Sequence, residues 1–292
     1  MKSIVCFGEV LWDMLPTGKK LGGAPLNVAL RAQSLGNQST VISAIGNDKN
    51  GKEIIDEMKA CSANLDYIQT SEKYSTSMVS VHLDDKGSAS YEIKMPCAWD
   101  DIKLSEKEIT LVKNADAFIY GSLIARKKTS RNTLMELLNH SKFNVFDINL
   151  RPPHYSMETL LNLMKYAHFI KFNDSEIFEI CTGLGHIPDS LEECMKFIAK
   201  KTDTSQICVT RGEKGALLLK NDEFVNNKGY QVTVADTVGA GDSFLATLIS
   251  ELLNGSKPQK AIDLASAIGA IVASKSGAIP PVSKEEIRAF VR

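Results

Sequence analysis

The sequence DTVGAGDSF, residues 236–244, is followed without a break by the apolar stretch LATLISELL, residues 245–253. Two glycines, two aspartates and two hydroxyl side chains share the first nine positions, and the apolar residues that follow recur at helical spacing. This pattern predicts a glycine turn that opens an amphipathic helix. Gly239, Ala240, Gly241 and Asp242 would then present their backbone amides at the helix N-terminus, where the helix dipole also favours a negative charge.

Asp242 is the residue of this stretch whose chemistry needs an explanation. A carboxylate on the first helical turn, beside amides that attract a phosphoryl group, is placed to accept the proton of an attacking hydroxyl. In the same arrangement Asp236 and the carbonyl of Val238 can turn toward a cation. The alternative is structural, with Asp242 only complementing the helix dipole.

Composition indicates a globular chain of ordinary make-up. Of its 292 residues, 43% are hydrophobic and 24% are charged, and the formal net charge is -1. Because there is no basic surplus, we expect small-molecule ligands and no nucleic-acid partner. No run of eighteen apolar residues occurs and the N-terminus MKSIVCFGEVLWD reads as a strand, so we expect a cytoplasmic protein with no membrane partner. Six scattered cysteines without a C-x-x-C pair predict reduced core thiols.

Apolar segments of strand length alternate with segments of helical periodicity along most of the chain. The alternation predicts an α/β fold with a mainly parallel central sheet flanked by helices. In such sheets ligands bind beside the carboxyl ends of the strands, so we expect the functional motifs at strand-to-helix turns. The expected strands cover residues 3–10, 39–46, 115–122, 143–149, 168–172 and 206–211, and the expected helices cover residues 26–36, 51–61, 156–167, 175–183, 190–201, 245–255 and 258–275.

Residues 76–93, TSMVSVHLDDKGSASYEI, break this alternation. Two alternating strands flank a turn at residues 84–87 with no helix between them, which predicts an inserted β-hairpin. The hairpin either covers a site and excludes water from it or forms an ordinary sheet edge.

Two glycine-containing stretches match nucleotide-binding patterns only in part. GNDKNGKE, residues 46–53, lacks the Ser or Thr that follows the lysine of a P-loop, so we interpret it as a glycine turn before a helix. Gly239-Ala240-Gly241 has Phe244 where a dinucleotide fingerprint needs its third glycine, which disfavours a Rossmann dehydrogenase.

Five motifs together resemble the PfkB/ribokinase family of carbohydrate kinases. GGAPLNVA, residues 22–29, resembles the N-terminal signature of the family, and DTVGAGDSF resembles the C-terminal one. Gly46-Asn47-Asp48 with Gly51, residues 173–176 and TRGEKGA at 210–216 fall between them in the family's order. The resemblance covers nearly the whole chain.

The resemblance implies a single ribokinase-like domain over residues 1–292, with a small β-strand lid formed by about residues 10–20 and 76–97. It also implies ATP as the donor, Mg²⁺ as a cofactor and Asp242 as the catalytic base, acting with the amides of residues 239–241. Polar groups and closely spaced glycines suit recognition of a polyol. The implied sugar-binding residues are Asp13, Gly23, Asn27, Asn149, Arg151 and Asp242. From the residues alone, Asp13 also fits a turn and Gly22 to Pro25 also fit a plain helix start.

The implied nucleotide site has an equally simple structural alternative. Asn173 and Glu176 resemble the N-x-x-E motif that orders magnesium through water, but the same spacing forms a helix-capping box. The remaining nucleotide-binding residues implied by the family are Thr210, Arg211, Gly212, Gly239 and Gly241. Arg211 also fits a solvated strand end.

SKSGAIP, residues 274–280, lies where the family folds a loop around a monovalent cation with backbone carbonyls. Potassium activation is therefore a hypothesis, and carbonyl ligands leave almost no side-chain signature. The expected ligands are Asp236, Val238, Val272, Lys275 and Gly277.

Within the family, GEVLWDMLP, FDINLRP and MPCAWDDI resemble fructokinases. Lys94 departs from them, since many carry an arginine before the corresponding proline. The leading hypothesis is an ATP-dependent kinase that phosphorylates a primary hydroxyl of fructose. The alternatives are a kinase of ribose, 2-keto-3-deoxygluconate or a nucleoside, or a sugar-binding regulator without catalysis. We also expect a homodimer through the lid, because Val79, Val81 and Leu83 form an apolar face on an edge hairpin.

Overall fold

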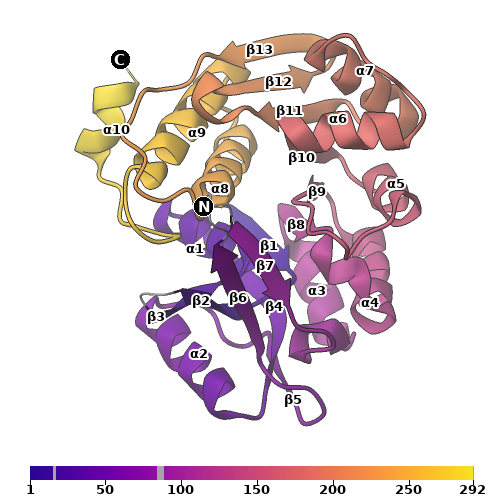
Figure 1. The fold of residues 1–292 in the computed structure, drawn as a ribbon, viewed down its shortest axis with the longest axis vertical. Coiled ribbons are helices and arrows are strands. Elements are labelled where there is room, and N and C mark those ends of the chain that lie inside the picture. Colours follow the sequence, from indigo (N-terminus) through magenta and orange to yellow (C-terminus); the bar gives the residue numbers. More distant parts are fainter. Residues whose placement is uncertain (16–17, 84–88, 292) are drawn as a thin grey trace.

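The structure is a computed structural model that describes residues 1–15, 18–83 and 89–291, shown in Figure 1. Within these residues the chain forms one large sheet, one small sheet and the helices that cover the large sheet. The turn predicted at residues 84–87 lies outside the described residues.

In the described residues the large sheet has nine strands in the order β13-β12-β11-β10-β9-β8-β1-β4-β5. Neighbouring strands are parallel from β5 to β11, and β12 and β13 continue the edge in antiparallel fashion. The prediction of a mainly parallel sheet is confirmed. The strands are β1 (Ser3–Phe7), β4 (Gln38–Gly46), β5 (Ile68–Ser71), β8 (Ala117–Gly121), β9 (Asn144–Asp147), β10 (Phe169–Asn173), β11 (Gln206–Thr210), β12 (Ala216–Lys220) and β13 (Glu223–Asn227).

Helices cover both faces of this sheet because its central strands are apolar on both sides. In β1, Val5 and Phe7 belong to one apolar cluster, while Ile4 and Cys6 belong to the other. The first cluster includes residues of α3 (Glu106–Asn114), α4 (Lys128–His140), α5 (Met157–Lys165), α6 (Asp174–Gly183) and α7 (Leu191–Thr202). The second includes residues of α1 (Ala24–Ser34), α2 (Lys49–Ala60), α8 (Ala240–Leu253) and α9 (Pro258–Ala273), and α10 (Lys284–Phe290) packs on α9.

The small sheet has the order β3-β2-β6-β7 and is separate from the large one. β6 (Ser77–Leu83) and β7 (Ala89–Ile93) are antiparallel, which confirms the predicted hairpin. β2 (Leu11–Leu15) pairs antiparallel with β3 (Gly18–Gly22) and parallel with β6. The small sheet therefore joins an N-terminal segment to the inserted hairpin.

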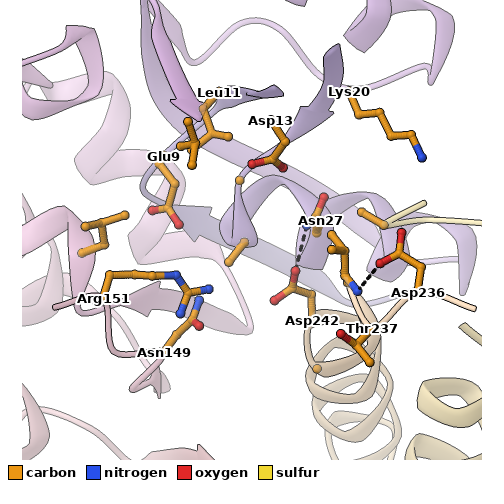
Figure 2. Close-up of a pocket in the computed structure, with 18 of the residues that line it drawn as sticks. Glu9, Leu11, Asp13, Lys20, Asn27, Asn149, Arg151, Asp236, Thr237 and Asp242 are labelled. Carbon is orange, nitrogen blue, oxygen red and sulfur yellow. Dashed lines mark hydrogen bonds between the residues drawn. The ribbon is translucent and has the colours of Figure 1, made fainter. Parts of the chain in front are cut away.

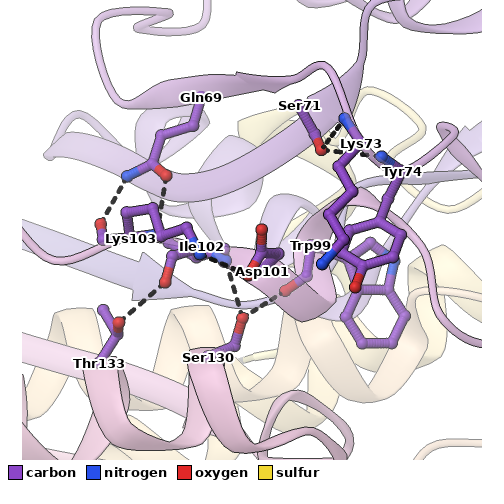
Figure 3. A network of polar contacts seen from close by, with 10 residues as sticks. All are labelled: Gln69, Ser71, Lys73, Tyr74, Trp99, Asp101, Ile102, Lys103, Ser130 and Thr133. Carbon is purple, nitrogen blue, oxygen red and sulfur yellow. Dashed lines mark hydrogen bonds and ion pairs between the residues drawn. The ribbon is translucent and has the colours of Figure 1, made fainter.

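The chain returns from the small sheet to the large one through a segment that polar contacts hold in place, shown in Figure 3. The Ser130 hydroxyl of α4 donates to the carbonyl of Trp99 at 2.7 Å and accepts from the amide of Ile102 at 2.9 Å. The Gln69 side chain donates to the carbonyl of Lys103 at 2.7 Å and accepts from its amide at 2.8 Å. Side chains of α4 and β5 thus fix the path of residues 99–103.

The stretch at residues 46–53 is a turn and a helix start, as the sequence predicts. Asp48 caps α2 by accepting from the amide of Gly51 at 2.8 Å. The same carboxylate accepts from the amide and the hydroxyl of Thr76, each at 2.8 Å, and so ties the start of the hairpin to the large sheet.

All six cysteines lie within the described residues and form no disulfide there; five are buried, as expected of core thiols, and Cys61 is exposed. Among the helices of residues 1–15, 18–83 and 89–291, none has the length and apolar character needed to cross a membrane.

Candidate active site

The N-terminal and C-terminal signatures meet through a direct side-chain contact. The Nδ2 of Asn27, on α1, donates a hydrogen bond of 2.8 Å to Oδ2 of Asp242, on the first turn of α8 (Figure 2). The two residues are 215 positions apart. The resemblance placed both at one site, and the structure brings them together there.

The start of α8 has the form that the glycines predicted. Gly239 precedes the helix with φ of 75°, a left-handed conformation that glycine adopts without strain. A Cβ there would collide with the carbonyl of Ala278, so the loop after α9 packs directly on this turn.

The predicted set of four free amides at this helix start needs one correction. The amide of Ala240 donates to the carbonyl of Thr237 at 3.2 Å, so it is not free to bind an anion. The amides of Gly241 and Asp242 have no partner in the described part of the chain, and no side chain caps the helix there. These two amides, with the helix dipole, leave an anion-binding mouth beside Asp242.

Asp242 lies in surroundings that favour its neutral form. Removal from water raises the pKa of this carboxyl group to about 6, although the hydrogen bond from Asn27 opposes the rise. Asp147 raises the pKa further, whereas Lys171 and Arg151 lower it. A carboxyl group with a pKa near 6 is ionised at neutral pH and still basic enough to accept a proton.

Asp242 borders a cavity of about 380 Å³ between the two sheets, shown in Figure 2. The small sheet contributes Asp13, from β2, and the large sheet contributes residues after its strands. All six predicted sugar-binding residues line this cavity: Asp13, Gly23, Asn27, Asn149, Arg151 and Asp242. Gly23 also precedes α1, so this glycine both starts the helix and lines the cavity.

Arg151 also lines this cavity, and the charge of its guanidinium group acts on three carboxyl groups. Its charge lowers the pKa of Glu9, Asp13 and Asp242, in each case against a larger increase caused by burial. Burial brings the pKa of Asp13 to about 6. Asn149, two residues before Arg151, has φ of 39°, an uncommon conformation for a residue other than glycine. The charge of Arg151 therefore acts on all three carboxyl groups of the cavity.

A buried ion pair lies beneath the same cavity. Nζ of Lys171 is 2.8 Å from Oδ1 and 3.1 Å from Oδ2 of Asp147, and the two residues are 7% and 5% exposed. Burial alone would lower the pKa of Lys171, but Asp147 and Glu176 raise it above its ordinary value. Lys171 lines the cavity close to Gly241, so a fixed ammonium group faces the mouth of α8.

Asn173 and Glu176 form a capping box at the start of α6. Oδ1 of Asn173 accepts from the amide of Glu176 at 2.8 Å, and Oε2 of Glu176 accepts from the amide of Asn173 at 2.7 Å. Oε1 of Glu176 accepts from the amide of Leu150 at 2.9 Å. Since both oxygens already accept backbone amides, the donor set fits a metal held through water better than a directly bound one.

A second cavity of about 480 Å³ adjoins the first and shares Asn173, Thr210, Thr237 and Gly241 with it. Gly212 and Ala240 line the second cavity. Arg211 lines neither cavity, because its Nη2 donates to Oδ1 of Asn226 at 2.6 Å on β13. In this structure the side chain of Arg211 therefore supports the sheet edge.

The residues expected around a monovalent cation lie on two segments that hydrogen bonds join, since the amide of Asp236 donates to the carbonyl of Ala273 at 3.2 Å. Oδ1 of Asp236 accepts from the amide of Val238 at 3.0 Å, and its Oδ2 accepts from the amide of Gly277 at 3.2 Å. Val272 and Lys275 lie at the end of α9 and outside both cavities, and the carbonyl of Val272 accepts from the amide of Lys275 at 3.0 Å. Asp236 organises this loop through its carboxylate.

Sequence reasoning missed Glu9, Lys171 and Asp147. Lys171 had a readable signal, since it is a charged residue inside the apolar strand HFIKF. Glu9 and Asp147 stand in the stretches GEVLWD and FDINLRP, where nothing in the pattern separates a buried carboxylate from a turn residue.

Comparison with known proteins agrees with this arrangement. Residues 1–285 match the model of the pfkB family carbohydrate kinases. The chain is 30% identical over 306 residues to probable fructokinase-5 of Arabidopsis thaliana, covering 95% of this chain and 93% of that protein.

Two solved structures share the fold. A sugar kinase of Pyrococcus horikoshii in complex with ATP is 28% identical, with a TM-score of 0.81 over 94% of this chain and 93% of that one. The 2-dehydro-3-deoxygluconokinase of Thermotoga maritima is 18% identical, with a TM-score of 0.84 over 99% of each chain.

The chain belongs to the pfkB family of carbohydrate kinases and has the ribokinase-like α/β fold. It is a phosphotransferase whose acceptor is a hydroxyl group of a sugar. The polar residues that line the cavity next to Asp242 suit a sugar as the acceptor.

Proposed function

We propose that this sugar kinase transfers the γ-phosphate of ATP to a primary hydroxyl of fructose, giving fructose 6-phosphate. The observation that carries the proposal is the position of Asp242, which hydrogen-bonds Asn27 where the two cavities meet. A sugar in the first cavity and ATP in the second would meet at the first turn of α8. The fructokinase name of the Arabidopsis relative and the ATP complex of the Pyrococcus kinase support this choice of substrates.

In the proposed reaction the residues of this chain position the two substrates and stabilise charge. Asp242 accepts the proton of the attacking hydroxyl as its oxygen bonds to the γ-phosphorus of ATP, while the bond from that phosphorus to the bridging oxygen of the β-phosphate breaks and ADP leaves. The amides of Gly241 and Asp242 face the transferring group. Lys171 adds a fixed positive charge near Gly241. Nothing in this step requires covalent attachment to the protein.

A neutral acceptor suits the charge balance of the first cavity better than a sugar acid. Glu9, Asp13 and Asp242 all interact with Arg151, so a carboxylate substrate would have to compete with three carboxyl groups for one guanidinium. Hydroxyl groups can donate to the same carboxylates without that competition.

A coupled ADP-release assay with fructose, ribose, 2-keto-3-deoxygluconate and adenosine tests the proposal. We expect the highest kcat/KM with fructose. A preference for 2-keto-3-deoxygluconate would overturn the proposed sugar and keep the reaction, whereas no ADP release with any of the four would overturn the proposed set of substrates.

We propose Mg²⁺ as the divalent cofactor, held through water by Glu176 and Asn173. When bound, magnesium would neutralise charge on the phosphates of ATP. We also propose activation by potassium beside Asp236, whose carboxylate organises the loop at residues 274–280. Equal rates in potassium and tetramethylammonium would overturn the potassium proposal.

A homodimer through the small sheet stays a proposal, with one change to its basis. Val79 is 4% exposed and lines the sugar cavity, so it is not available to a partner, and the side chains of Val81 and Leu83 lie outside the described set. Light scattering at micromolar concentration should give about twice the monomer mass. A mass near 32.0 kDa would show a monomer.

A further inference from the structure

Glu9 is a buried carboxyl group in the first cavity, here called the sugar cavity, and takes no part in the proposed proton transfer. It follows β1, is 6% exposed and lines the cavity beside Leu11 and Asp13. Its backbone carbonyl packs so closely on Gly23 that a Cβ at residue 23 would collide with it. The position of Glu9 is therefore fixed by the glycine that precedes α1.

One oxygen of this carboxyl group has no partner. Oε2 of Glu9 is buried, and no donor within the described ranges of the chain forms a hydrogen bond with it. Buried polar atoms in folded proteins are nearly always hydrogen-bonded, and a carboxylate oxygen left without a donor is costly. Figure 2 shows the Glu9 side chain pointing into the space above Arg151, on the side where Asp13 also points inward. Because Glu9 lines the cavity, a hydroxyl group of a ligand there is placed to donate to its carboxyl group.

The surroundings of Glu9 restrict what that donor is. Burial raises the pKa of Glu9 to about 7, while Arg151 and the amide of Ala24 lower it and the charge of Asp242 raises it. An anionic group next to Glu9 would be repelled by its carboxylate. A neutral hydroxyl group donates a hydrogen bond to a carboxylate oxygen without adding charge.

We propose that Glu9 is a specificity-determining residue whose carboxyl group accepts a hydrogen bond from one non-reacting hydroxyl of the bound sugar. The inference rests on the proposed function, because it requires a polyol in this cavity. Glu9 is separate from the proton transfer assigned to Asp242, so it acts on sugar binding more than on the rate of phosphoryl transfer. The competing explanation is structural, with Glu9 supporting only the start of α1 through the amide of Ala24.

The test measures KM and kcat of Glu9→Gln with fructose and with analogues that each lack one hydroxyl: 1-deoxyfructose, 3-deoxyfructose, 4-deoxyfructose and 2,5-anhydromannitol. With fructose, we expect KM to rise about 10-fold to 100-fold and kcat to change less than about threefold. One analogue should bind the wild-type enzyme more weakly than fructose does. Its KM should be the same in Glu9→Gln as in wild type, because its missing hydroxyl is the partner of Glu9.

Glu108→Gln is the matched control. Glu108 is also a buried glutamate, 4% exposed, but it caps α3 outside both cavities. Its substitution should leave the KM of every sugar unchanged.

Two results would overturn the inference while the proposed function stands: a KM for fructose within about twofold of wild type in Glu9→Gln, or an equal further loss for every analogue. The second result is what a merely structural role predicts. If none of the sugars causes the wild-type enzyme to release ADP, and calorimetry detects no sugar binding, the proposed function fails. This inference then fails with it.

Discussion

At the scale of single residues, the acidic groups around the sugar cavity differ in what they contact. Asp242 accepts from Asn27 and lies at the mouth of α8, where the helix dipole and two free amides surround it. Asp13 lies on the small sheet, opposite Lys20 of β3, and its carboxylate packs against Gly22, just before α1. Replacing each aspartate by asparagine should therefore affect a different kinetic constant.

We predict that Asp242→Asn lowers kcat by roughly 100-fold to 10,000-fold, the usual effect of removing a positioned base, with much less change in sugar affinity. Asparagine keeps the size and an oxygen that can accept from Asn27, but it is not basic. Asp13→Asn, the comparison variant, should raise the KM of the sugar more than it lowers kcat. Steady-state kinetics with saturating ATP measure both. If Asp242→Asn kept more than about a tenth of wild-type kcat, the assignment of the base would be wrong.

The raised pKa of Asp242 also predicts a pH-dependent cost in stability. The pKa is about 6 in the folded protein against 3.8 for the ordinary group, so the folded state binds this proton more tightly than the unfolded state does. Stability therefore falls as pH rises through about 4 to 6 and stays lower above that range. Asp242→Asn removes the cost, and its Tm should exceed that of wild type by a few degrees at pH 8 but not near pH 4.

Thermal unfolding without ligands between pH 4 and pH 8 measures this difference. Asp203→Asn is the control, because Asp203 is exposed and has a left-handed backbone that asparagine tolerates. If Asp242→Asn were less stable than wild type at pH 8, the ionised carboxylate would stabilise the folded protein, and this prediction would be wrong.

Residue-scale prediction succeeded where a side chain belonged to a contiguous motif. The sequence alone indicated a helix start at Asp242 and left its function open, and the family resemblance then placed Asn27 and Asp13 with it. The ion pair of Lys171 with Asp147 was missed because it depends on β9 and β10 being neighbours. Single-sequence patterns contain no information on which strands are adjacent.

At the scale of elements, the start of α6 combines a structural and a functional interpretation. Asn173 and Glu176 satisfy each other's backbone amides, which is all that a capping box requires. Asn173 and Glu176 also line the first cavity, and Asn173 the second. A comparison with a second capping box in this chain separates the two roles.

We predict that Glu176→Gln lowers the free energy of unfolding by about 1 to 2 kcal/mol and raises the Mg²⁺ concentration for half-maximal rate several-fold. Glu108→Gln, in the box formed with Ser105 on α3, should cause a similar loss of stability without any effect on magnesium dependence. Denaturant unfolding and magnesium titrations of the initial rate provide the two readouts. Equal magnesium curves for the two variants would leave Glu176 with a structural role alone.

Element prediction was most complete for the alternating strands and helices of the large sheet, since each has its own periodicity. The hairpin of β6 and β7 was also predicted, because its turn is local. The parallel pairing of β2 with β6 was not, because it joins residues about position 12 to residues about position 78. Such pairings depend on the whole fold and not on a local pattern.

At the scale of the whole molecule, the small sheet forms one wall of the sugar cavity and the large sheet forms the other. Leu11, Asp13 and Val79 face the cavity from β2 and β6, opposite Arg151 and Asp242. The two sheets share no strand, so the wall formed by the small sheet can shift relative to the large sheet through its connecting segments. We propose that the small sheet acts as a lid over the sugar.

This lid predicts a change in hydrogen exchange on binding. With fructose at about 100 times its Kd, amides of β2, β3, β6 and β7 should exchange up to about 100-fold more slowly, because exchange through lid opening then requires release of the sugar. Amides of α4, which contacts neither cavity, provide the internal control. ADP alone should protect the strand-to-helix turns around Thr210 and Gly212 and leave the small sheet unchanged. If fructose protected the large-sheet turns but not the small sheet, the small sheet would be a fixed wall, and water exclusion during transfer would have to come from the bound nucleotide.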